Sequence, residues 1–187
     1  MSDAKFASRA GEKLDFALKE FKIDVKGLIC ADFGSSTGGF VDCLLQNGAK
    51  KVYAVETGYG ELAWKLRQDE RVVVMERTNA MHVVLPEKVD LITNDTSWTR
   101  QEKIMPNILS NLKTEGFILS LIKPHYEADK KILHHGKLEE DEAEKVAKDT
   151  LHLIKELFGV KVLGFAKSPL LGSKGGNSEY LAFLQKL

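Results

Sequence analysis

The sequence predicts an α/β fold, in which helices cover both faces of a mostly parallel, seven-stranded sheet and the last strand runs antiparallel. Short apolar runs alternate with amphipathic segments along the chain, which is the pattern of parallel strands joined by crossover helices. A glycine- and serine-rich turn follows the first apolar run. The last two apolar runs are joined by a loop without helical spacing, and such a loop cannot make the long crossover that parallel neighbours need.

Apolar spacing and end signals place the individual elements. An amphipathic helix is expected over residues 10–21, and a helix over residues 139–158 whose acidic start suits the helix dipole. Residues 124–137 show no clear period, and a loop of this length is typically functional or mobile. Shorter helices are expected at residues 40–46, 61–68 and 101–113. Strands are expected at residues 28–33, 51–56, 71–75, 89–94, 116–122, 160–165 and 179–184.

The bulk composition is that of one soluble domain over residues 1–187, with residues 1–26 as an N-terminal helical segment and residues 27–187 as the core. No apolar leader is present and no apolar run approaches the ~20 residues of a membrane span, so we expect a cytoplasmic protein without a membrane partner. Cys30 and Cys43 lie in apolar segments, which favours buried thiols over a disulfide or metal role. The sequence does not reveal the oligomeric state.

The charge balance bears on nucleic-acid binding. Lysine plus arginine and aspartate plus glutamate number 27 each, which counts against a protein that grips nucleic acid unaided, because neutralising phosphates requires clustered positive charge. Residues 1–26 do concentrate lysine and arginine, while residues 139–149 carry most of the compensating acid. This clustering indicates either a nucleic-acid surface within a neutral chain or two solvated helix faces.

The glycine-rich turn between the first strand and the next helix is the candidate cofactor site. It runs from Asp32 to Phe40 with the letters DFGSSTGGF, and its glycines let the backbone turn sharply and approach a ligand. Ligands of such folds sit beyond the carboxyl ends of the strands. Taken alone, the turn could also serve NAD or be a plain tight turn.

Three features favour S-adenosylmethionine over a dinucleotide: the spacing D-x-G-x-x-x-G-G, Asp32 and Glu56. Asp32 ends the strand, where its carboxylate would repel a phosphate but attract a sulfonium or ammonium group. Glu56 ends the second strand and can accept both hydroxyls of an adenosine ribose. Asn79 could bind the adenine edge or simply form a turn. The predicted cofactor-binding residues are Asp32, Gly34, Ser35, Ser36, Thr37, Gly38, Gly39, Phe40, Glu56, Thr57, Asn79 and Asp95.

Four ionisable residues fall where the predicted fold would bring them together. Asp95 and Lys123 end the fourth and fifth strands, and Glu179 begins the last one. If that last strand is antiparallel, its start lies at the same edge of the sheet. Lys13, on the helix before the first strand, could fold over this edge. The alternative is a set of surface salt bridges.

Transfer of a methyl group to a ribose hydroxyl is a reaction that these four residues could catalyse. The hydroxyl is a poor nucleophile at neutral pH and needs a positioned base, which a lysine can be if its pKa is lowered. We interpret Lys123 as the base, with Asp95 and Glu179 as orienting groups. Lys13 would tune Lys123 or hold an RNA phosphate.

Several segments together resemble the TlyA family, the FtsJ-like ribosomal RNA 2′-O-methyltransferases often labelled hemolysins. The resemblance runs in order from about residue 7 to the end. It is carried by SRAGEKL, DFGSSTGGF, VETGYGELAWKLR, ERTN, NDTS, IKPHYE and NSE, which start at Ser8, Asp32, Val55, Glu76, Asn94, Ile122 and Asn177.

The resemblance implies a fold, a cofactor and a catalytic set. The fold is that of class I S-adenosylmethionine-dependent methyltransferases, which is Rossmann-like. FtsJ-like enzymes use a Lys-Asp-Lys-Glu tetrad, and the matching positions here are Lys13, Asp95, Lys123 and Glu179. The implied substrate is a cytidine ribose in ribosomal RNA, so ribosomal RNA or ribosomal subunits are the expected partners.

The sequence also departs from the family pattern. The family usually carries a small N-terminal RNA-binding domain, whereas this chain starts at the methyltransferase domain, so that domain has been removed or the chain is a reduced form. Ala10 and Glu56 replace a usual glycine and aspartate, and residues 131–137 read KILHHGK where the family has a glycine-rich stretch. We expect the cofactor site to survive these changes, whereas they put the RNA target in doubt.

Some residues near the predicted site allow two interpretations. His134 and His135 are adjacent on a polar loop without further ligands, so we interpret them as solvated and predict no metal site. Trp98 could stack on a base or serve in packing.

Two other functions compete with catalysis: a membrane-acting hemolysin, and a cofactor-binding RNA or ribosome partner without turnover. No helix with a broad cationic face and a strong apolar face supports the first.

Overall fold

The computed structural model describes residues 4–172 and 175–187. The strands are β1 (Ile29–Phe33), β2 (Lys51–Val55), β3 (Val72–Met75), β4 (Val89–Asn94), β5 (Leu112–Ile122), β6 (Lys161–Lys167) and β7 (Tyr180–Gln185). The α-helices are α1 (Ala10–Glu20), α2 (Gly39–Gln46), α3 (Trp64–Arg67), α4 (Gln101–Asn111), α5 (Pro124–Glu127) and α6 (Glu140–Phe158), and a 3₁₀ helix, η1, spans Lys130–Ile132.

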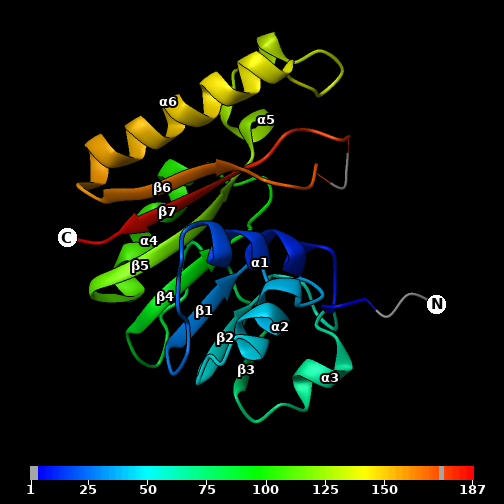
Figure 1. Cartoon of the computed structure of the whole chain (residues 1–187), viewed down its shortest axis with the longest axis vertical. Helices are drawn as coiled ribbons and strands as arrows, with labels where there is room; N and C mark the ends of the chain where they lie inside the picture. Colours follow the sequence, from blue (N-terminus) through cyan, green and yellow to red (C-terminus); the bar gives the residue numbers. More distant parts are fainter. Residues whose placement is uncertain (1–3, 173–174) are drawn as a thin grey trace.

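The strands form one sheet in the order β3-β2-β1-β4-β5-β7-β6 (Figure 1). The pairs from β3 to β5 are parallel, whereas β7 is antiparallel to both β5 and β6. The predicted seven-stranded sheet with an antiparallel last strand is therefore confirmed. Because β7 runs backwards, its first residue lies at the same edge as the last residues of β1, β4 and β5.

Helices cover the sheet on both sides, and strand side chains alternate between two buried clusters. Cys30 and Leu91 belong to the cluster beneath α1 and α2. Their neighbours Ala31 and Ile92 belong to the cluster beneath α4 and α6. Both cysteines are buried free thiols, as expected. The central strands are apolar on both faces because each face is covered.

The expected helix over residues 61–68 is wrong at its start, since α3 covers only Trp64–Arg67. Ala63 is extended, with φ −55° and ψ 138°, and its backbone nitrogen donates to Thr37 O at 3.1 Å. Leu62 is buried next to Gly38, which has no side chain to exclude it. Packing against the glycine-rich turn therefore outweighs the helical pattern of this segment.

Two other boundaries differ from expectation. The helix expected over residues 101–113 ends at Asn111, because Leu112 already pairs with Val89 and begins β5. The segment 124–137, expected as a long loop, contains α5 and η1. Pro124 at the first position of α5 suits a helix start, because that position needs no backbone donor.

The N-terminal helix is held close to the sheet by contact between α1 and α2. A β-carbon at Gly39 would overlap Ser8 Oγ and lie 2.8 Å from the backbone nitrogen of Gly11. Asp42 of α2 also accepts a hydrogen bond from the backbone nitrogen of Ala7 at 2.7 Å. The absence of a side chain at position 39 thus sets how near α1, and Lys13 on it, come to the edge of the sheet.

We predict that Gly39→Ala destabilises the protein by about 1–3 kcal/mol, because α1 must move away from α2 to make room. Urea denaturation measures this effect. The double variant Gly39→Ala/Ser8→Gly removes one of the two overlapping groups and should recover part of the loss. A Gly39→Ala protein as stable as the wild type would mean that the two helices separate at no cost.

Candidate active site

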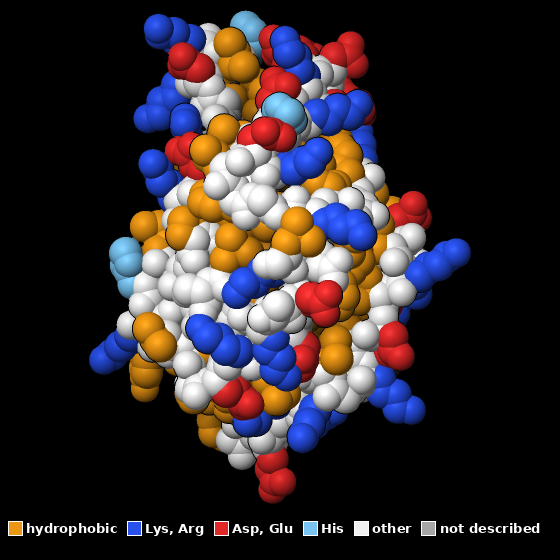
Figure 2. Space-filling model, turned by 90° about the vertical axis from the view of Figure 1, so that its left-hand side faces the viewer, with side chains coloured by type: hydrophobic (Ala, Val, Ile, Leu, Met, Phe, Trp, Pro, Cys, Tyr) orange, Lys and Arg blue, Asp and Glu red, His pale blue; other side chains and the backbone are white. Residues whose placement is uncertain are grey.

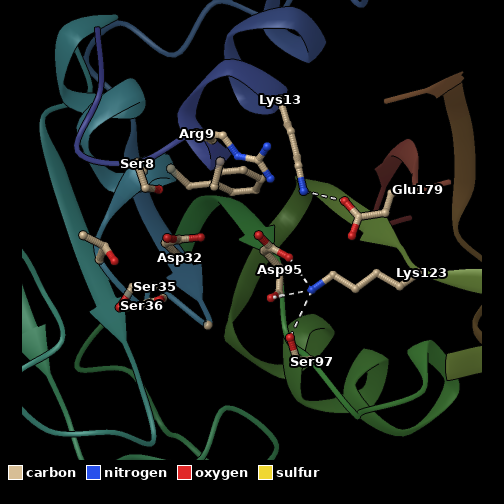
Figure 3. Close-up of a pocket in the computed structure, with 15 residues that line it drawn as sticks. Ser8, Arg9, Lys13, Asp32, Ser35, Ser36, Asp95, Ser97, Lys123 and Glu179 are labelled. Atoms are coloured by element: carbon tan, nitrogen blue, oxygen red, sulfur yellow. Dashed lines mark hydrogen bonds and ion pairs between the residues drawn. The ribbon is translucent and has the colours of Figure 1, made fainter. Parts of the chain in front are cut away.

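A cavity of about 380 Å³ opens at the edge where β1, β4 and β5 end and β7 begins (Figure 3). Crevices at this edge are the usual ligand sites of open parallel sheets. The lining residues come from both ends of the chain and from its middle. They are Ser8, Arg9, Ala10, Lys13, Asp32, Gly34, Ser35, Ser36, Thr37, Gly39, Phe40, Asp95, Ser97, Lys123 and Glu179.

The four residues predicted to converge do line this one cavity, as two ion pairs (Figure 3). Lys13 on α1 pairs with Glu179, which directly precedes β7. Lys123, directly after β5, lies with its Nζ 2.6 Å from Oδ1 of Asp95, which directly follows β4. The side chains are only 5–18% exposed. The pairing differs from our interpretation in one respect, because Glu179 contacts Lys13 and not Lys123.

The ammonium of Lys123 lies among oxygens of one short segment. Its Nζ is 3.3 Å from Asp95 O, 3.5 Å from Thr96 O and 3.3 Å from Ser97 Oγ. Asp95 Oδ1 is close to the ammonium but accepts no well-aligned hydrogen bond, so this contact is mainly one of charge. The environment of Lys123 therefore depends on how residues 95–97 are held.

Asp32 is a buried carboxyl group that pairs with no cation among the described residues. It is 1% exposed, and its Oδ1 accepts a hydrogen bond from Thr93 Oγ1 at 2.7 Å. Burial raises the pKa of Asp32 to about 7; the Thr93 hydrogen bond opposes this rise, while the charges of Asp95 and Glu56 add to it. A cationic group entering the cavity would stabilise the ionised form of this side chain.

A second cavity of about 320 Å³ adjoins the first, sharing Gly34, Ser36, Asp95 and Ser97. The predicted residues Glu56, Thr57 and Asn79 line it, together with Val55, Thr78, Ala80, Met81, Thr96, Trp98, Thr99 and Ile104. Asn79 Oδ1 accepts a hydrogen bond from the Met81 backbone nitrogen at 2.9 Å, so Asn79 does form a turn.

Glu56 is held as an ionised acceptor in the second cavity. Its carboxylate accepts hydrogen bonds from the backbone nitrogens of Ser36 and Gly58, both at 2.9 Å. Burial acts to raise the pKa of Glu56, but these backbone hydrogen bonds outweigh it and the pKa is lowered. Glu56, which replaces the usual aspartate of the family, therefore still provides a carboxylate at this position.

These residues fit S-adenosylmethionine. Asp32 and Glu56 place carboxylates where an amino group and a ribose would need them. Ser35 Oγ is buried without a hydrogen-bond partner in the described chain, so it can serve a ligand. A β-carbon at Gly34 would lie 3.1 Å from the backbone of Asp95 and close the junction of the two cavities.

One predicted cofactor residue lies outside both cavities, and some residues of the first cavity were not predicted. Gly38 does not line either cavity; its open side faces Leu62 and Leu66, so it serves packing. Arg9 and Ser97 do line the first cavity but were not predicted. Helical spacing could have found Arg9, which precedes Lys13 by four residues and so shares its face of α1 (Figure 3).

Aromatic residues border the catalytic end of the site. Trp98 is 78% exposed and packs against Tyr126, with ring centroids 5.1 Å apart. Both residues line a further cavity of about 250 Å³ together with Lys123 and Glu179. Because Trp98 is so exposed, its contact with Tyr126 leaves most of its side chain uncovered. His134 and His135 are exposed on the loop before α6.

The face of the molecule opposite the candidate site carries mixed charge. Figure 2 views this face, where lysine and arginine lie among aspartate and glutamate without one dominant basic patch. Within residues 4–172 and 175–187, no helix is both long and apolar enough to cross a membrane. No group of three or more metal-ligating side chains is gathered in the same residues.

Sequence comparison points to one family. Residues 6–186 match the FtsJ-like methyltransferase family. Hemolysin A of Brachyspira hyodysenteriae is 42% identical over 188 residues, which cover 97% of this chain and 78% of that protein. The 16S/23S rRNA (cytidine-2'-O)-methyltransferase TlyA of Mycobacterium tuberculosis is 38% identical over 194 residues, which cover 98% of this chain and 70% of that protein.

Solved structures agree. A protein from Lactococcus lactis, provisionally called a hemolysin, superimposes with a TM-score of 0.93 at 38% identity, over 99% of this chain and 90% of that one. TYW2 of M. jannaschii, solved in complex with AdoMet, shares the fold with a TM-score of 0.62 at 16% identity, over 96% of this chain and 78% of that one. The chain therefore belongs to the FtsJ-like methyltransferase family and is an S-adenosylmethionine-dependent enzyme.

Proposed function

We propose that this enzyme methylates a ribose 2′-hydroxyl of ribosomal RNA, with Lys123 as the general base. The observation that carries the proposal is the position of the Lys123–Asp95 pair, on the wall of a cavity that adjoins the Glu56 cavity. Glu56 would hold the cofactor's ribose and Asp32 its amino group. Asp95 and Ser97 line both cavities and so lie where the two cavities meet.

Each residue of the site has a separate role in the proposed reaction. Bound S-adenosylmethionine supplies the methyl group. The 2′-oxygen of the substrate would accept the methyl group from the sulfonium, whose sulfur–carbon bond breaks, and the hydroxyl proton would pass to Nζ of Lys123. Lys123 must be neutral to accept it, and general base catalysis of this kind contributes about 10²–10⁴-fold. Asp95 and Ser97 orient the amine, and the Lys13–Glu179 pair closes the opposite wall.

The substrate class rests on the relatives and on the aromatic residues at the rim. The M. tuberculosis relative carries cytidine-2'-O-methyltransferase in its name. Trp98 and Tyr126 offer an exposed aromatic surface beside Lys123 on which a base could stack, while its ribose reaches the lysine. We therefore propose a cytidine in ribosomal RNA as the target.

The test is transfer of tritiated methyl from S-adenosylmethionine to ribosomal subunits that lack the modification, followed by nuclease digestion and identification of the labelled nucleoside. Label in 2′-O-methylcytidine supports the proposal. Label in a base-methylated nucleoside would contradict it. Cofactor binding by calorimetry without any transfer would favour a ribosome partner without turnover, and leakage of liposomes by the pure protein would favour the hemolysin activity.

A further inference from the structure

A buried hydrogen-bond network lies directly behind the Asp95–Lys123 pair. Asn94, Gln101 and Ser120 are each no more than 2% exposed. Asn94 Nδ2 donates to Ser120 Oγ at 2.9 Å and to Gln101 Oε1 at 3.2 Å, and Ser120 Oγ donates to Gln101 Oε1 at 2.7 Å. The network thus joins the end of β4, the last part of β5 and the first residue of α4.

Glu127 extends this network to the segment that follows Lys123. Its Oε1 accepts a hydrogen bond from the backbone nitrogen of Gln101 at 2.9 Å. Arg100, the residue before α4, makes no side-chain cap, so Glu127 of α5 supplies the acceptor that the start of α4 needs. Burial raises the pKa of Glu127 to about 7, opposed by this same hydrogen bond. A glutamate oxygen can accept the bond whether or not the side chain is ionised.

These contacts clamp residues 95–100 at both ends. At one end, Asn94 Oδ1 accepts a hydrogen bond from Thr96 Oγ1 at 3.0 Å. At the other end, Gln101 is fixed by Glu127 and also donates from Nε2 to Leu121 O at 3.3 Å. The four oxygens near Lys123 Nζ in the described chain all belong to the clamped segment.

We propose that Glu127, acting through Gln101, is a positioning residue that holds residues 95–97 in place around the amine of Lys123. This inference rests on the proposed role of Lys123 as the base. Neither Glu127 nor Gln101 lines the two cofactor cavities or the cavity beside Trp98. Their effect on catalysis is therefore indirect, through the segment that they hold.

The experiment compares Glu127→Ala, Glu127→Gln and the control Glu102→Ala, all assayed for methyl transfer to ribosomal subunits well below their melting temperatures. Glu102 lies in the first turn of α4, beside Gln101, but its side chain makes no hydrogen bond to Gln101. We expect Glu127→Ala to lower kcat by about 10–100-fold with little change in KM for the cofactor, because small misplacements of catalytic groups are costly. Glu127→Gln keeps an acceptor and should restore kcat, and Glu102→Ala should resemble the wild type.

Normal kcat in Glu127→Ala, or equal loss in Glu127→Gln and Glu127→Ala, would overturn the proposal. A second measurement needs no RNA: exchange of the Gln101 amide proton, followed by NMR, should accelerate in Glu127→Ala but not in Glu127→Gln. Unchanged exchange in Glu127→Ala would also overturn it. Lys123→Ala, assayed in parallel, tests the assumption that Lys123 is the base. Full activity of this variant would contradict that assumption, and the exchange of the Gln101 amide would still test the role of Glu127.

Discussion

Lys123→Arg should be as inactive as Lys123→Ala, with both variants reduced in kcat by about 10²–10⁴-fold. Arginine keeps the positive charge beside Asp95, but its guanidinium does not give up a proton in proteins and so cannot serve as a base. The comparison therefore separates proton transfer from simple charge pairing. Single-turnover methyl transfer at saturating S-adenosylmethionine is the measurement, since it excludes effects on product release.

Cofactor affinity provides the control for both lysine variants. The predicted contacts for the adenosine and the amino group are Glu56 and Asp32, which make no hydrogen bond to Lys123. Calorimetric titration should therefore give nearly wild-type affinity. Lys130→Ala, on the exposed 3₁₀ helix η1, should leave both binding and turnover unchanged. Full activity of Lys123→Arg would mean that the lysine contributes charge and that another group takes the proton.

Asp32→Asn should have opposite effects on cofactor binding and on stability. Removing the buried carboxylate should weaken S-adenosylmethionine binding by about 10–100-fold, because a hydrogen bond to a charged group contributes about 1.5–3 kcal/mol. The same change removes an ionisable group whose folded-state pKa of about 7 lies above its ordinary value of 3.8. The apo protein should therefore become more stable at pH 8, by a few kcal/mol at most.

The pKa of Asp32 determines how stability and cofactor affinity each change with pH. Between pH 4 and 7 the folded wild type holds a proton on Asp32 that the unfolded chain has lost, so this group's contribution to stability falls as pH rises through that window. The advantage of Asp32→Asn should thus be small near pH 4 and complete above pH 7. Cofactor affinity of the wild type should rise with pH up to about 7 and then level off, because a cation binds the ionised carboxylate.

Urea denaturation and calorimetric titration at several pH values measure both effects. Asp90→Asn is the matched control: Asp90 lies on the neighbouring strand β4, pairs with Lys113 and lines neither cofactor cavity. It should leave cofactor affinity unchanged. Wild-type affinity that is equal at pH 5.5 and pH 8.5 would contradict the role proposed for Asp32.

The sequence was sufficient to predict that Lys13, Asp95, Lys123 and Glu179 meet. Three of them flank strands, and the absence of a helix before the last strand indicated its direction, so their shared edge follows from the topology alone. The sequence did not predict which of these four residues pair with one another. Lys13 reaches Glu179 because α1 packs closely on α2 at Gly39, and that approach depends on contacts that no local pattern encodes.

The same limit explains the other differences. Leu62 and Ala63 fit a helical pattern, yet they follow the surface of the glycine-rich turn because burial of Leu62 there is worth more than another turn of helix. The contact between Gln101 and Glu127 joins residues that are 26 positions apart and share no periodicity. Local spacing predicts elements and edges well, whereas it carries no information on which side chains meet between elements.

The pairing of Lys13 with Glu179 joins residues 166 positions apart, and this sets an order of events during synthesis. The residues that line the Glu56 cavity lie no later than Ile104, so they are translated well before Glu179. The catalytic cavity, by contrast, lacks one of its lining side chains until Glu179 has been made. Translation that stops between these two positions therefore yields a chain with the residues of the Glu56 cavity but without the Lys13–Glu179 pair.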